Sequence, residues 1–245
     1  MNHYPPASPG LRRWLGLTNG EETFDRPRVT AGYASAMIAF VVVLAFLIPE
    51  GPLRLDERWG RLMADAETPF LTHVALVFNA LGHGILRALT TAGIGLALLI
   101  KNRRAALLAF ILAEALTPLL VNLIKLIVGR ERPSGAMIEA HGSSYPSGHA
   151  AYAGATAVIL VLLFTKEGKH RRAWWVSAAV ATAGMAWSRS YLHVHWLSDV
   201  VAGAILGAGV ALLSLAVVQM LSTRWREGED QPSRPIAASA SSTSS

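Results

Sequence analysis

The sequence contains no cysteine, which excludes disulfide bonds, thiolate catalysis and cysteine-ligated metal sites. Charged residues are also scarce, at 16% of the 245 residues, whereas 52% are hydrophobic and the mean hydropathy is +0.38. Several apolar stretches approach the length that crosses about 30 Å of hydrocarbon. The sequence therefore predicts an all-α, polytopic membrane helix bundle.

Six membrane-spanning helices are expected, at 30–48, 83–100, 104–127, 148–165, 172–190 and 198–222. The second is interrupted by Arg87 and two glycines, so the apolar run from Leu71 to Ile100 could also be merged or divided. These ranges give a cytoplasmic N-terminal segment over 1–29, a membrane domain over 30–222 and a tail over 223–245. The tail is rich in Ser, Ala and Pro, which predicts disorder.

Lysine and arginine collect before the first predicted helix, between the second and third, between the fourth and fifth, and after the sixth. The positive-inside rule makes these places, and both termini, cytoplasmic in a cell membrane. The loops at 49–82, 128–147 and 191–197 then face outward. Within the first of them, residues 53–67 mix apolar and charged side chains at helical spacing. This pattern predicts an amphipathic helix on the outer membrane surface, either beside a lipid entrance or as a simple anchor.

Three short motifs in the second half of the chain combine two histidines, a carboxylate and several cations. They are Lys125 through Arg132-Pro133, then Pro146-Ser147-Gly148-His149, then Ser188-Arg189 followed by His195 and Asp199. Neutral imidazole is a nucleophile near pH 7, and a second imidazole can move the proton that the leaving group needs. A spacing of four residues would place His195 and Asp199 on one helix face, where the carboxylate can fix the tautomer of the ring.

The same motifs predict an anion-binding site. The Pro-Ser-Gly-His motif precedes a long apolar run, so the backbone N–H groups of 147–149 are expected at a helix N-terminus, which attracts anions. Basic side chains would neutralise the remaining phosphoryl oxygens during transfer. The predicted phosphate-binding residues are Lys125, Arg132, Ser147, Gly148 and Arg189, with Arg130 as an additional candidate cation.

In residue type, order and spacing, the three motifs resemble those of the type 2 phosphatidic acid phosphatase family. The resemblance extends from about Asp56 through the last apolar helix. It implies a phosphohistidine intermediate on His195, orientation of that ring by Asp199, and acid and then base chemistry by His149. The family is metal-independent, so the resemblance implies no cofactor. The wider family also includes soluble vanadium haloperoxidases, and the hydrophobic composition argues against that branch.

One position departs from the family pattern. The family often has glycine where this chain has His193, within Tyr191-Leu192-His193-Val194-His195. We interpret His193 as a residue of a solvated loop, with an effect on substrate fit as the alternative. His149, His193, His195 and Asp199 are also ligand types for a metal, but the surrounding lysine and arginines would repel a divalent cation. The sequence therefore predicts no metal.

Two features inside the predicted helices concern packing. Glu114 and Arg87 are expected at similar depths, which predicts a buried ion pair that keeps two helices in register, with proton-coupled transport as the weaker interpretation. Gly203 and Gly207 give the last helix a face of small residues that permits close packing. This face could pack within the chain or between two copies, so the oligomeric state is open.

The expected function is hydrolysis of a lipid phosphate or diphosphate at the outer membrane face. Resemblance to bacterial family members favours a polyprenyl diphosphate, such as the undecaprenyl carrier, as the substrate. Phosphatidic acid, phosphatidylglycerol phosphate, transfer to another acceptor and noncatalytic lipid binding are the alternatives. The expected partners are the lipid substrate and the bilayer, since a formal net charge of +6 is too small to indicate nucleic acid.

Overall fold

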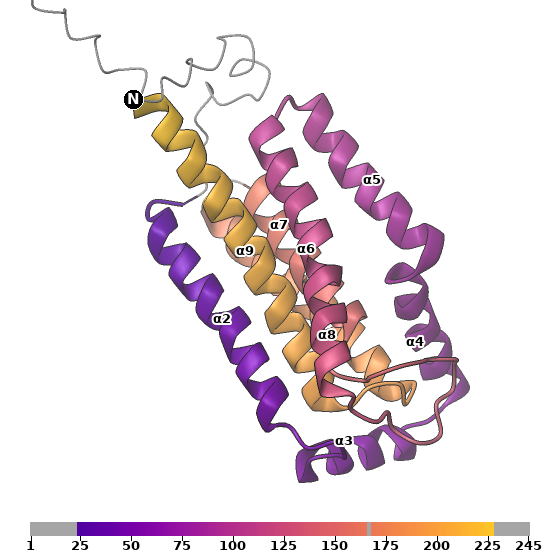
Figure 1. Ribbon diagram of the computed structural model, residues 1–245. Coiled ribbons are helices and arrows are strands. Elements are labelled where there is room, and N and C mark those ends of the chain that lie inside the picture. The colour runs from indigo at the N-terminus through magenta and orange to yellow at the C-terminus, as the bar shows by residue number, and fades with distance from the viewer. Residues whose placement is uncertain (1–23, 166–167, 228–245) are drawn as a thin grey trace, which may run out of the picture.

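The computed structural model describes residues 24–165 and 168–227, and those ranges contain helices without strands. Most of the predicted N-terminal segment and of the predicted tail lies outside these ranges. The described helices, shown in Figure 1, are α2 (Pro27–Leu47), α3 (Arg54–Asp65), α4 (Pro69–Leu81), α5 (Gly84–Ile100), α6 (Arg104–Val128), α7 (Gly148–Phe164), α8 (Lys169–Tyr191) and α9 (Leu197–Glu227). The all-α prediction is confirmed, and a helix occupies each of the six ranges predicted to span the membrane.

Three described helices are long and apolar enough to cross a membrane: α2, α6 and the 197–223 part of α9. The pair formed by α4 and α5 is bent by 53° at a short break and gives a fourth candidate if it is one span. α7 is apolar but shorter. The chain is thus a multi-pass membrane protein, and the number of six spans stays a prediction.

The region predicted as an outer loop over 49–82 contains two helices. α3 is the predicted amphipathic helix, with Leu55 and Leu62 exposed and Asp56 buried. The six predicted spans left α4 in a loop, whereas the alternative division of the run from Leu71 to Ile100 matches the separate helices α4 and α5. The start of α4 also carries a recognisable signal. The Thr68 side chain accepts a 3.2 Å hydrogen bond from the Leu71 N–H, and proline occupies the first turn.

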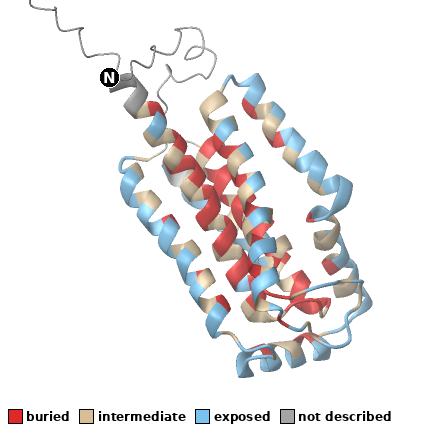
Figure 2. Ribbon diagram, viewed as in Figure 1, coloured by how far each residue is buried: buried red, intermediate tan, exposed pale blue. Residues whose placement is uncertain are grey.

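The centre of the bundle is formed by α7 and α9 with α6 beside them. Figure 2 shows the buried residues concentrated there, whereas α2 and α5 on the outside are mostly exposed. Glycines let α9 approach α7 closely: a Cβ atom on Gly207 would lie 1.8 Å from the Ala151 carbonyl oxygen, and one on Gly203 would lie 2.3 Å from that of Ser147. The small-residue face predicted on the last helix therefore packs within the chain.

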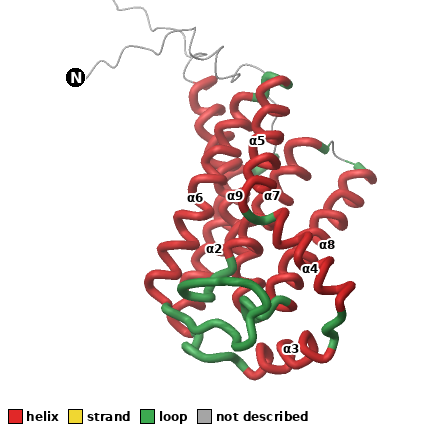
Figure 3. Tube along the Cα trace, turned by 90° about the vertical axis from the view of Figure 1, so that its right-hand side faces the viewer, coloured by secondary structure: helices red, strands yellow, loops and turns green. Residues whose placement is uncertain are grey.

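One end of the bundle gathers the segments that carry the motifs. The connection over 129–147, the start of α7 and the turn before α9 lie there, next to α3 (Figure 3). Tyr145 anchors this connection, because its hydroxyl donates a 2.9 Å hydrogen bond to the Val41 carbonyl of α2. Backbone contact joins the motifs as well, since the Ser147 N–H donates a 3.0 Å hydrogen bond to the Asp199 carbonyl.

Candidate active site

His195 and Asp199 lie together at the start of α9, as their spacing predicts. His195 lies two residues before the first residue of the helix, and Nδ1 of its ring is 3.6 Å from Oδ2 of Asp199. The same Oδ2 accepts a 2.9 Å hydrogen bond from the Trp196 N–H, which orients the carboxylate toward the ring. Burial lowers the pKa of His195 to about 4 although Asp199 acts in the opposite direction. The imidazole is therefore neutral at pH 7 and available as a nucleophile.

Arg132 faces the other nitrogen of the same ring. Its Nη1 is 3.5 Å from Nε2 of His195 and donates a 2.6 Å hydrogen bond to the Val194 carbonyl. Further bonds of 3.0 Å run to the carbonyls of His141 and Gly142. Backbone contacts thus fix a cation beside Nε2 of His195.

His149 occupies the first turn of α7 and packs against the break between α4 and α5. Its Nε2 is buried without a partner. The ring of His83 stacks parallel to it, with centroids 6.2 Å apart. Gly82 permits this packing, because a Cβ atom there would lie 2.5 Å from Cδ2 of His149. The α4–α5 break therefore forms one wall of the site.

The two other predicted cations are also held by neighbours. Arg189 donates from Nη1 to the side-chain oxygen of Asn79, and Lys125 donates to the Ser143 carbonyl. Asn79 thus holds Arg189 through its side chain, and it belongs to the helix that ends at Leu81, just before the Gly82 that lies against His149. Asn79 was not predicted as a site residue, because the six predicted spans left it in a loop and its signal was a lone amide within an apolar run.

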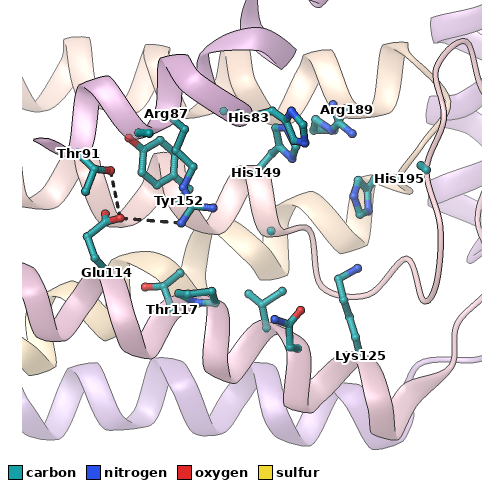
Figure 4. A pocket seen from close by; sticks show the side chains of 18 of the residues that line it. His83, Arg87, Thr91, Glu114, Thr117, Lys125, His149, Tyr152, Arg189 and His195 are labelled. Atoms are coloured by element: carbon teal, nitrogen blue, oxygen red, sulfur yellow. Dashed lines mark hydrogen bonds and ion pairs between the residues drawn. The ribbon is translucent and has the colours of Figure 1, made fainter.

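A cavity of about 890 Å³ connects these groups. Its lining includes both histidines, the three cations Lys125, Arg132 and Arg189, and Gly148. Figure 4 shows His149 between His83 and His195, with Lys125 on the opposite side. Three basic side chains around two imidazoles give a site suited to an anion with several oxygens. Among the residues that the structure describes, no group of three His, Asp or Glu side chains could hold a metal ion.

The cavity continues between α5 and α6 to Arg87 and Glu114 (Figure 4). Arg87 Nη2 lies 3.9 Å from Oε2 of Glu114, so the predicted ion pair is confirmed. Thr91 donates a 3.2 Å hydrogen bond to the same carboxylate. The Arg87 guanidinium also lies 4.6 Å from the centre of the Tyr152 ring. These contacts join α5, α6 and α7 in the middle of the bundle.

Three predicted site residues lie away from the lining of this cavity. Ser147 is fully buried, and its N–H donates to Asp199 instead of pointing at a bound anion. The Arg130 guanidinium binds the carboxylates of Asp56 and Asp199, so it is not a fourth cation in the cavity. His193 is not free in a solvated loop, because its Nε2 lies 2.9 Å from Oε1 of Glu67. Its φ of +53° explains why glycine suits this position.

Comparison with known proteins finds related sequences. Residues 106–223 match the PAP2 superfamily. An undecaprenyl-diphosphatase of Sulfolobus acidocaldarius is 37% identical over 75 residues, which are 30% of this chain and 33% of that relative. The phosphatidylglycerophosphatase B of Bacillus subtilis is 24% identical over 178 residues, which are 71% of this chain and 88% of that relative. The chain thus spans about a third of the first relative and most of the second.

A solved structure has the same fold. The transmembrane PAP2 type phosphatidylglycerolphosphate phosphatase from Bacillus subtilis superposes with a TM-score of 0.62 at 24% identity. The superposition covers 82% of this chain and 98% of that protein. The helical membrane architecture is therefore shared over most of the described residues.

Proposed function

Because the chain carries a PAP2 superfamily domain over residues 106–223, we propose that it is a membrane lipid phosphatase acting through a phosphohistidine on His195. The observation that carries this proposal is the environment of one buried ring. A carboxylate lies behind Nδ1 of His195, and Arg132 and the cationic cavity lie before Nε2. This arrangement orients a neutral imidazole toward a site that attracts phosphate.

The mechanism has two steps. In the first, Nε2 of His195 attacks phosphorus in line, the bond from phosphorus to the leaving oxygen breaks, and His149 donates a proton to that oxygen. Asp199 stabilises the positive charge that develops on the His195 ring. In the second, His149 takes a proton from water, the resulting oxygen attacks phosphorus, and inorganic phosphate leaves His195 restored. Lys125, Arg132 and Arg189 stabilise the phosphoryl oxygens in both steps.

The substrate we propose is a polyprenyl diphosphate that is converted to its monophosphate. The similarity to an undecaprenyl-diphosphatase supports this choice. Phosphatidylglycerol phosphate is the second candidate, supported by the longer match to phosphatidylglycerophosphatase B. Phosphatidic acid would use the same residues.

The proposed site faces outward. Support comes from the distribution of basic residues, since Lys101, Arg104 and Arg171 mark the opposite end of the bundle from the motifs. The basic residues near the motifs have a role in the proposed site, so we do not apply the positive-inside rule to them. Both termini then lie in the cytoplasm, and lipid substrates reach the site from the outer leaflet.

The test is release of phosphate by the purified protein from polyprenyl diphosphate, phosphatidic acid and phosphatidylglycerol phosphate, with a chelator present. We expect release that persists in the chelator and is lost in His195→Ala. A folded protein that releases no phosphate from any of the three substrates would contradict the proposal. A noncatalytic lipid binder would instead keep its lipid affinity and its biological effect in His195→Ala.

A further inference from the structure

We propose that Asp56 and Arg130 are positioning residues for Asp199, which makes the interfacial helix α3 a working part of the active site. Arg130 is 1% exposed although it carries a charge. Its Nη1 lies 2.6 Å from Oδ1 of Asp199, and its Nη2 lies 2.8 Å from Oδ2 of Asp56. One guanidinium therefore bridges the carboxylate beside His195 and a carboxylate of α3. This inference rests on the proposed function.

The two oxygens of Asp199 have different partners. Arg130 occupies Oδ1, whereas Oδ2 accepts from the Trp196 N–H and faces Nδ1 of His195. A carboxylate with both oxygens engaged cannot rotate about its terminal bond without breaking a charge-assisted hydrogen bond. Arg130 thereby keeps Oδ2 directed at the imidazole, which is the orientation that fixes the ring tautomer.

Asp56 in turn holds Arg130 and the start of α9. Its oxygens accept from the Ser198 N–H and the Ser198 hydroxyl, each at 2.8 Å, in addition to Arg130. The Ser198 hydroxyl also lies 2.7 Å from Nη1 of Arg130. Asp56 is therefore linked to Asp199 in two ways. Arg130 bridges the two carboxylates, and Ser198, which binds Asp56, precedes Asp199 in the first turn of α9.

The charges of this network suit the proposed chemistry. Two carboxylates and one guanidinium sum to one negative charge, which is buried behind His195 while Lys125 and Arg132 face the ring from the cavity. A single negative charge at Nδ1 stabilises the cationic ring that forms when Nε2 binds phosphorus. Without Asp56 the network is neutral, and Arg130 competes more strongly with His195 for the Asp199 carboxylate.

Asp56→Asn tests the proposal, because it removes the charge with almost no change in shape. The control is Asp65→Asn on the same helix, where the carboxylate is exposed. We expect kcat to fall by about ten-fold or more in Asp56→Asn with KM within about two-fold, since the change acts on the reacting ring and not on the cavity. A residue that only anchors α3 would lower the thermal unfolding temperature and leave kcat of the folded protein unchanged, and that result would overturn the proposal.

Ser198→Ala gives a second, milder variant if Asp56→Asn does not fold. It removes one hydroxyl that contacts both Arg130 and Asp56 and leaves every charge in place. We expect a loss in kcat of about three- to ten-fold with an unchanged KM. A kcat equal to that of the unmodified protein would count against the positioning role.

A readout without substrate separates this proposal from the proposed function. Diethyl pyrocarbonate modifies neutral imidazole, and peptide mass spectrometry gives the rate at His195. We expect slower modification of His195 in Asp56→Asn than in Asp65→Asn at pH 7, because the carboxylate that faces Nδ1 is no longer held in its orientation. If the unmodified protein shows no phosphatase activity, the proposed function fails, while equal modification rates in the two variants would refute the positioning role.

Discussion

The backbone N–H of Ser147 donates a 3.0 Å hydrogen bond to the carbonyl of Asp199. This contact joins the first residue before α7 to the first turn of α9, so the two motifs that carry His149 and His195 cannot move independently. The close approach depends on Gly203, one turn farther along α9, which leaves no room for a side chain beside the Ser147 carbonyl. The separation of the two histidines is therefore set by helix packing.

Gly203→Ala should disturb this contact. The added Cβ atom would lie 2.3 Å from the Ser147 oxygen, so the helices must separate, at a cost of about 1–3 kcal/mol in stability. We expect a lower unfolding temperature in detergent together with reduced phosphatase activity. Gly93→Ala is the matched control, because a Cβ atom there meets nothing within 4 Å. Equal effects of the two substitutions would show that the close α7–α9 contact is not required.

The pH dependence should reflect the buried His195. Burial lowers the pKa of this ring to about 4, so it stays neutral and nucleophilic well below the ordinary value of 6.5. We expect kcat/KM to fall on the acid side near pH 4, because the ring is protonated only as the pH drops through its own pKa. The profile is measured with a soluble short-chain substrate in a buffer of constant ionic strength. An acid limb at pH 6.5 assigned to His195 would contradict the buried, neutral state.

Asn79→Leu should weaken the site without removing a cation. The amide accepts from Arg189, and a hydrogen bond to a charged group contributes about 1.5–3 kcal/mol. We expect kcat/KM to fall by about ten- to one hundred-fold. His73→Gln on the exposed face of the same helix is the control and should retain the original activity. Unchanged kinetics in Asn79→Leu would show that Arg189 is positioned by other contacts.

Exchange of Arg87 and Glu114 tests the ion pair. Removal of one partner leaves an unpaired charge in the bundle and should destabilise the protein. Breaking a fully buried pair costs about 3–5 kcal/mol, and we expect a smaller loss here because Arg87 is partly exposed. Single changes to Gln should lower the unfolding temperature. The double exchange, Arg87→Glu with Glu114→Arg, should recover part of the loss. No recovery would mean that neighbours such as Tyr152, rather than the pair itself, account for the stability.

Much of the candidate site could be predicted because its main residues have short-range relationships. His195 and Asp199 are four residues apart at a helix start, and His149 begins an apolar run, so local spacing places them at helix ends. The residues that hold them could not be predicted in the same way. Asp56 and Asn79 meet the motifs across 74 and 110 positions of the chain, through Arg130 and Arg189 respectively. Spacing carries no information on such contacts.

Helices were predictable where an apolar stretch is long enough to cross a membrane, and less predictable where a helix is short. The six predicted spans left α4 in a loop because its 13 residues are too few to cross a membrane alone, although a division of the run from Leu71 to Ile100 was an open alternative. Thr68 and Pro69 are a helix start signal that could have identified it. Arg130 was predicted as an additional candidate cation, whereas the buried carboxylates of Asp56 and Asp199 determine where its guanidinium points.

Asp56, Asn79 and His83 all precede residue 106, where the match to the PAP2 superfamily begins. The histidines of the proposed active site and these neighbouring residues therefore belong to different parts of the chain. A shortened protein that began at residue 106 would keep every motif yet leave the Arg130 and Arg189 side chains without their α3 and α4 acceptors. Exchange of this domain between relatives should consequently include α3 and α4, because the side chains that hold Arg130 and Arg189 come from these helices.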